Sequence, residues 1–172
     1  MFKAIILFLL LFTLDNIIVI IFPIQPLFGS FIIVPYLVLI GLCFYVFYDE
    51  KNYAPWLAFA FGLVYDMYGA NLLGIYSTLF PIIVIVIKKF IVPVTPVNFV
   101  SMFYIITIEI LIVEIVLFSL VRLITNRTMP IFTFVQYRLI TTLVFNSIIL
   151  LFLYGPLIKI FKLQLGKKSK LS

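Results

Sequence analysis

The chain consists almost entirely of long apolar runs separated by short polar breaks, and this pattern limits the folds open to it. Hydrophobic residues make up 66% of the 172 residues, charged residues only 10%, and the mean hydropathy is +1.34. A soluble domain of this composition would expose large apolar surfaces. Because a membrane-spanning helix needs about 20 mostly apolar residues, the chain has room for about six spans. We therefore expect an integral membrane protein.

The polar breaks predict an all-α, polytopic membrane bundle of about six transmembrane helices in a single domain. The expected spans are residues 4–22, 28–48, 54–69, 72–87, 97–121 and 134–158, followed by a basic cytoplasmic tail at 159–172. The first run is interpreted as a retained span, because it lacks the small-x-small cleavage site of a signal peptide and contains Asp15 and Asn16. Pro35, near the start of the second span, predicts a kink.

Residues 53–87 are few for two crossings of a hydrocarbon core about 30 Å thick. One alternative is that both helices are short and the bilayer thins locally. The other is that residues 69–74 form a tight or partly re-entrant turn at membrane depth. Either way, this hairpin differs from an ordinary pair of spanning helices.

Residue types that support much enzyme and metal chemistry are scarce. The chain has no histidine and one cysteine, Cys43. An internal disulfide is therefore excluded, and the commonest transition-metal ligand and general base are absent. We expect no cofactor, no metal site and no enzymatic activity. The net charge of +6 does not indicate a nucleic-acid partner, because the basic residues lie at the ends of the apolar runs, where they act as topology and lipid signals.

The distribution of lysine and arginine predicts the orientation. With six spans and a cytoplasmic N-terminus, nine lysines lie inside and three arginines outside. This positive-inside bias predicts a multi-pass protein with both termini in the cytoplasm. Five lysines of the tail are expected to contact anionic lipid headgroups or to serve as a plain stop-transfer flank: Lys159, Lys162, Lys167, Lys168 and Lys170.

Charged residues inside the predicted spans are candidates for a buried polar network: Asp15, Asp66, Glu109, Glu114 and Arg138. Ionisable groups at membrane depth usually face a protein interior or a water-filled cavity, and they are functional-site candidates. The topology concentrates them in the outer half of the bundle, where we expect an ion pair between Asp66 and Arg138. Glu109 and Glu114 lie about 140° apart on one helix and do not form a catalytic pair by themselves. They serve either as structural polarity or, with Asp15 or Asp66, as a proton or cation pathway.

Small residues around Asp66 predict a close helix contact. Gly62, Asp66 and Gly69 follow the spacing i, i+4 and i+7, so they share one narrow helix face, and Gly74 follows in the turn. Such a face lets another backbone approach closely. The partner helix is either another span of this chain or a span of another protein.

The run FGLVYDMYGANLLGIYSTLFPIIVIVIKKF, residues 61–90, resembles the signature region of the MreD family of bacterial rod shape-determining membrane proteins. The family's Gly-Leu-x-x-Asp element matches Gly62, Leu63 and Asp66. Its Leu-Gly pair matches residues 73–74, and its proline-containing span matches Pro81. Length, number of spans and the basic C-terminus are also similar.

This resemblance implies a non-catalytic scaffold of the elongation (rod) complex in the bacterial cytoplasmic membrane. The implied partners are the single-span protein MreC and, directly or through it, MreB filaments, a SEDS glycosyltransferase and a class B penicillin-binding protein, which together link cell shape to peptidoglycan synthesis. An alternative is a substrate-binding S-component of an energy-coupling factor (ECF) vitamin transporter, a class of similar size whose general fold the MreD family is thought to share. A lipid-handling protein is a third alternative.

Overall fold

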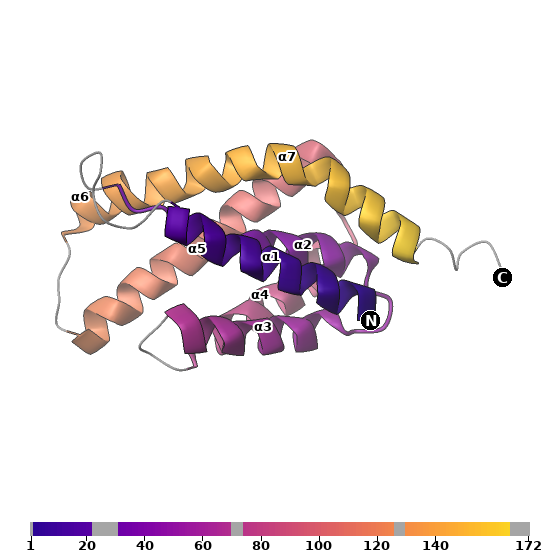
Figure 1. The fold of residues 1–172 in the computed structure, drawn as a ribbon, viewed down its shortest axis with the longest axis horizontal. Helices are drawn as coiled ribbons and strands as arrows, with labels where there is room; N and C mark the ends of the chain where they lie inside the picture. Colours follow the sequence, from indigo (N-terminus) through magenta and orange to yellow (C-terminus); the bar gives the residue numbers. More distant parts are fainter. Residues whose placement is uncertain (1, 22–30, 70–73, 126–129, 166–172) are drawn as a thin grey trace.

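The computed structural model describes residues 2–21, 31–69, 74–125 and 130–165, and the regular elements in these ranges are all helices. In chain order they are α1 (Phe2–Ile21), α2 (Leu37–Tyr48), α3 (Ala54–Gly69), α4 (Ile75–Val86), the π-helix η1 (Ile87–Ile91), α5 (Phe99–Thr125), α6 (Ile131–Phe134), the π-helix η2 (Val135–Leu139) and α7 (Ile140–Leu165). The all-α class is confirmed for the described residues, and successive helical segments alternate in direction along the bundle (Figure 1).

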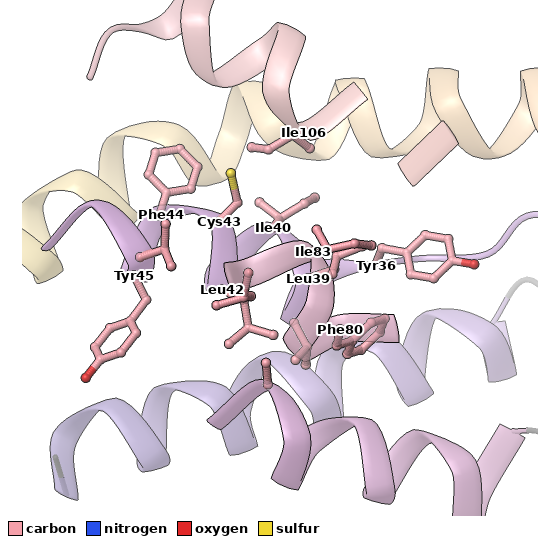
Figure 2. Close-up of a cluster of buried hydrophobic side chains, with 14 of the residues drawn as sticks. Tyr36, Leu39, Ile40, Leu42, Cys43, Phe44, Tyr45, Phe80, Ile83 and Ile106 are labelled. Carbon is pink, nitrogen blue, oxygen red and sulfur yellow. The ribbon is translucent and has the colours of Figure 1, made fainter. Parts of the chain in front are cut away.

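Helix α2 lies at the centre of the bundle. Its residues 37–46 are all buried, and it contacts α1, α3, α4, α5 and α7. Figure 2 shows its side chains, including Leu39 and Phe44, in the apolar core with Phe80 and Ile83 of α4 and Ile106 of α5. This short central helix is therefore the element on which the rest of the bundle packs.

Three helical stretches are long and apolar enough to cross a membrane: residues 4–21, 99–124 and 131–162. The others are shorter. Helices α2 and α4 have 12 residues each and α3 has 16, which corresponds to lengths of about 18 and 24 Å. Helix α4 continues directly into η1, and residues 70–73 lie outside the described part, so both alternatives for residues 53–87 stay predictions.

The segment before α2 is not helical. Residues 31–36 have no regular secondary structure and lead into α2 at Leu37, so Pro35 lies before the helix and does not kink it. The residue before a proline disfavours the α conformation, which explains why the helix begins only after it. We call residues 31–36 the strap. Six extended residues reach up to about 20 Å, so the strap and α2 together are long enough to cross the membrane.

The last helix is longer than expected. Helices α6, η2 and α7 run without a break from Ile131 to Leu165, so Lys159 and Lys162 lie on α7 and not in a separate tail. Lys167, Lys168 and Lys170 lie outside the described residues. The beginning of α1 and the end of α7 are at the same end of the bundle (Figure 1).

Candidate functional site

Asp15 on α1 caps the N-terminus of α2. Its Oδ1 accepts a hydrogen bond from the Leu37 amide at 2.9 Å, and its Oδ2 accepts from the Val38 amide at 3.3 Å and from the Tyr65 hydroxyl. The first amides of a helix have no partner within the helix, and the helix dipole favours a negative charge beside them. Asp15 is therefore a buried helix cap, and the N-terminal amides and dipole of α2 stabilise its negative charge.

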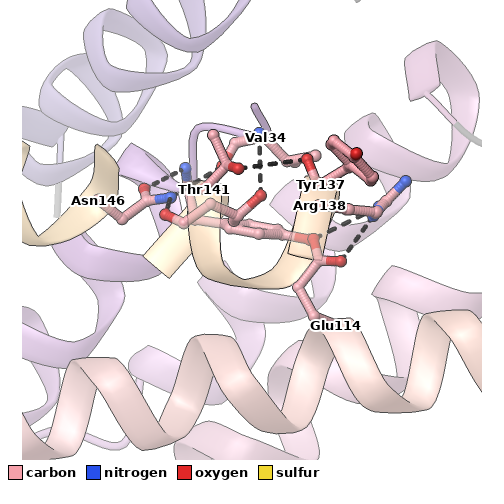
Figure 3. Close-up of polar contacts among 8 residues, drawn as sticks. Val34, Glu114, Tyr137, Arg138, Thr141 and Asn146 are labelled. Carbon is pink, nitrogen blue, oxygen red and sulfur yellow. Dashed lines mark hydrogen bonds and ion pairs between the residues drawn. The ribbon is translucent and has the colours of Figure 1, made fainter. Parts of the chain in front are cut away.

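The polar backbone of the strap is paired with α7 and η2. Asn146 accepts from the Tyr36 amide at 2.9 Å and donates to the Val34 carbonyl oxygen at 2.8 Å. Thr142 Oγ1 accepts from the Val34 amide at 3.3 Å, and the Tyr137 carbonyl oxygen accepts from the Ile32 amide at 2.8 Å. Figure 3 shows Val34 and Asn146 in contact, beside Arg138. Non-helical backbone is tolerated at membrane depth only where protein groups satisfy it in this way.

Glu114 on α5 pairs with Arg138 on η2. Arg138 Nε donates to Glu114 Oε2 at 2.7 Å, and Nη2 donates to Oε1 at 3.3 Å (Figure 3). The Tyr36 hydroxyl also donates to Glu114 Oε1, at 2.7 Å. The Glu114 side chain is fully buried, whereas 29% of the Arg138 side chain is exposed. The expected pair between Asp66 and Arg138 is therefore wrong, because Arg138 uses the acid of the neighbouring helix.

Asp66 instead caps the N-terminus of α4. Its carboxylate accepts hydrogen bonds from the amides of Gly74, Tyr76 and Ser77 at 3.0, 2.8 and 3.0 Å. Gly74 has a φ of +101°, a left-handed conformation that glycine adopts without strain. The Asp66 side chain thus joins α3 to the first residues of α4 within the hairpin.

Gly62 shows what covers the small-residue face. A Cβ at this position would lie 2.5 Å from the Tyr76 carbonyl oxygen and 2.6 Å from the Ser77 Cα. Helix α4 of the same chain therefore occupies the face at Gly62, and no second helix fits there. The surroundings of Gly69 lie outside the described side chains.

Glu109, on α5, is isolated from these groups. It is only 2% exposed, and neither carboxylate oxygen has a hydrogen-bond partner among the described residues. The Cys43 thiol on α2 is close enough to interact with it electrostatically but does not meet hydrogen-bond geometry. Glu109 therefore does not join the predicted polar network.

A third aspartate caps a helix at the lysine-rich end of the bundle. Asp49 accepts from the amides of Tyr53 and Ala54, and Lys88 donates to its Oδ2 at 2.8 Å and to its carbonyl oxygen at 2.7 Å. Burial alone would raise the pKa of Asp49, but the Lys88 and amide hydrogen bonds outweigh it and hold the pKa below the ordinary value of 3.8. This pair fixes the α2–α3 turn against η1.

A cavity of about 240 Å³ lies among α1, the strap, α3, α4 and η2. We call it the polar cavity. Asp15 and Asn16 of α1, Tyr65 and Tyr76, and Arg138 contribute its polar lining. The structure therefore brings two of the predicted network residues, Asp15 and Arg138, to one cavity, places Glu114 behind Arg138, and leaves Asp66 and Glu109 elsewhere.

Several residues of this site were not anticipated from the sequence: Tyr36, Tyr65, Thr142 and Asn146. Asn146 and Thr142 stand four apart inside an apolar run, which is a signal that one helix face pairs with polar groups. The two tyrosines carried no such signal among the ten tyrosines of the chain.

Comparison with known proteins identifies the family. Residues 1–164 match the family model of the rod shape-determining protein MreD. Neither the comparison with curated proteins nor that with solved structures gives a match. Since the family match covers nearly the whole chain, including the Asp66 hairpin, the strap and the polar cavity, this chain belongs to the MreD family of rod shape-determining membrane proteins.

Proposed function

We propose that this protein is a non-catalytic scaffold in the elongation complex of a rod-shaped bacterium, where it holds peptidoglycan synthases at sites of wall growth. The family match over residues 1–164 carries this proposal. The family match supports a place in the cytoplasmic membrane, and the positive-inside bias of lysine and arginine supports both termini inside the cell.

The use of the buried acids supports a scaffold. Asp15 and Asp66 cap helices of their own chain, and Glu114 holds Arg138. The Asp15 and Asp66 carboxylates accept from amides that have no partner within their own helices, whereas Glu114 accepts from the side chains of Arg138 and Tyr36. Acids occupied in this way stabilise an irregular bundle and are not available for proton transfer.

The proposed partner in the membrane is the single span of MreC, with MreB filaments, a SEDS glycosyltransferase and a class B penicillin-binding protein bound directly or through MreC. Helix α4 already covers Gly62, so we place the partner contact on the outer faces of the bundle. Lys159, Lys162 and the following lysines would hold the end of α7 at anionic lipid headgroups.

Depletion followed by microscopy tests the cellular role. Cells that lose the protein should become round or wide, and expression of the intact chain should restore rods. Affinity-tagged protein should co-purify MreC from detergent extracts. Normal rods after complete depletion would contradict the proposal.

One observation favours a second candidate, the substrate-binding component of a vitamin transporter. The polar cavity has the charged and aromatic lining that a small polar ligand requires. Thermal unfolding of the detergent-solubilised protein with a panel of vitamins tests it. Stabilisation by one vitamin, together with vitamin auxotrophy on depletion, would favour transport over scaffolding.

A further inference from the structure

The polar cavity presents hydrogen-bonding groups that the described residues leave unpaired. Arg138 has five N–H donors, and its ion pair with Glu114 uses one at Nε and one at Nη2. The described residues supply no acceptor for the other three. The Asn16 amide donates to the Phe12 carbonyl oxygen at 2.8 Å, but no described residue donates to its Oδ1. A ligand that satisfies both residues would therefore carry hydrogen-bond acceptors for Arg138 and a hydrogen-bond donor for Asn16 Oδ1.

The charges around the polar cavity restrict the occupant further. Asp15 and Arg138 line it, and Glu114 neutralises Arg138, so one negative charge remains. The N-terminus of α2 partly offsets this charge at Asp15. An added anion would have no matching positive charge. A zwitterion adds no net charge and offers anionic oxygens to Arg138 together with ammonium N–H groups to Asn16.

The remaining walls are apolar and reach the lipid-facing surface. Phe12, Val19 and Ile33 line the polar cavity, and Tyr68, on the same lining, is 75% exposed. Ile20, which follows Val19 on α1, is also exposed. The volume of about 240 Å³ holds about eight water-sized groups, enough for a small headgroup whose acyl chains remain in the bilayer.

We propose that the polar cavity binds the headgroup of a zwitterionic phospholipid that carries a primary ammonium, with its phosphate at the free edge of Arg138 and its ammonium at Asn16 Oδ1. Glu114 fixes the guanidinium in place before the lipid arrives, which favours binding because little side-chain freedom is lost. Lipid binding here does not depend on the partner contacts proposed above, so either proposal can fail without the other.

Lipid binding to the full chain, delipidated in detergent, tests this proposal. Native mass spectrometry and thermal unfolding would be measured with phosphatidylethanolamine, phosphatidylcholine or phosphatidylglycerol. We expect selective retention of phosphatidylethanolamine and stabilisation by it. Phosphatidylcholine has no ammonium N–H for Asn16, and phosphatidylglycerol adds an unmatched negative charge. If the three lipids act equally on the intact protein, or if none binds, the proposal is overturned.

The Asn16→Leu variant tests the ammonium contact directly. It should weaken phosphatidylethanolamine binding about tenfold, the effect of losing one charge-assisted hydrogen bond, and abolish the preference over phosphatidylcholine. Thr13→Leu is the matched control, because Thr13 is exposed on the same helix and also bonds to the backbone one turn earlier. An unchanged preference in Asn16→Leu would contradict the assignment. Water-soluble phosphoethanolamine should bind far more weakly than the lipid, and equal affinity would overturn a lipid as the occupant.

Discussion

Two buried acids, Asp66 and Glu109, lie in the same bundle at nearly the same exposure, 1% and 2%, but their surroundings differ completely. Asp66 accepts three backbone hydrogen bonds at the start of α4. Glu109 accepts none from the described residues. An acid at membrane depth can therefore either replace missing helix hydrogen bonds or stay isolated in the core, and only the first kind holds the fold together.

The difference follows from where the backbone is irregular. Asp15 and Asp66 lie beside helix N-termini, and the Glu114 pair lies beside the strap through Tyr36. Glu109 lies in the middle of the regular helix α5, where every neighbouring amide already has its helical partner. The predictions below use this contrast and share one assay. Cys43 is the sole cysteine and is buried, so a thiol-reactive fluorophore reports unfolding in detergent.

The largest effect is expected at the ion pair. Glu114→Leu leaves the Arg138 guanidinium without its partner and should lower the free energy of unfolding by about 3 kcal/mol, since breaking a buried pair exposes the full cost of the remaining charge. The double variant Glu114→Leu/Arg138→Leu should recover much of this loss. A double variant that is as unstable as Glu114→Leu would show that the pair is not the reason for the effect.

The next effect is expected at the cap of α4. Asp66→Ala removes three hydrogen bonds to backbone amides, one of them buried, and should cost about 2 kcal/mol, the combined effect of a lost cap and unpaired donors. Asp66→Asn keeps an acceptor and should cost less. If the two variants unfold at the same temperature as the intact protein, Asp66 is not a structural cap.

A smaller effect is expected where α3 meets α4. Gly62→Ala adds a methyl group that would lie 2.5 Å from a backbone oxygen of α4, so the helices must separate at a cost of about 1 to 2 kcal/mol. Gly155→Ala is the matched control, because a Cβ there meets nothing within 4 Å and alanine favours the helix. Equal stability of both variants would mean that α3 and α4 are not in close contact.

The sequence predicted those parts of this fold that depend on local pattern. The all-α class and the third helix, residues 54–69, follow from the apolar runs and polar breaks. The strap does not follow from the local pattern, because its backbone hydrogen bonds are made with Thr142 and Asn146, more than 100 positions away. The choice of partner for Arg138 was also beyond the sequence. Asp66 and Glu114 were both available to it, and only the tertiary structure shows that α4 amides satisfy Asp66.

The smallest effect is expected at Glu109, and it is the sharpest test of the contrast with Asp66. Glu109→Met removes a carboxyl group that pairs with no described residue and replaces it with an apolar side chain of similar length. Because no hydrogen bond is lost, the free energy of unfolding should change by less than about 1 kcal/mol in either direction. Complementation of depleted cells separates folding from function. If Glu109→Met folds normally but fails to restore rods, then Glu109 acts in the assembled complex. A buried acid without a hydrogen-bond partner would then be a functional residue of this bundle.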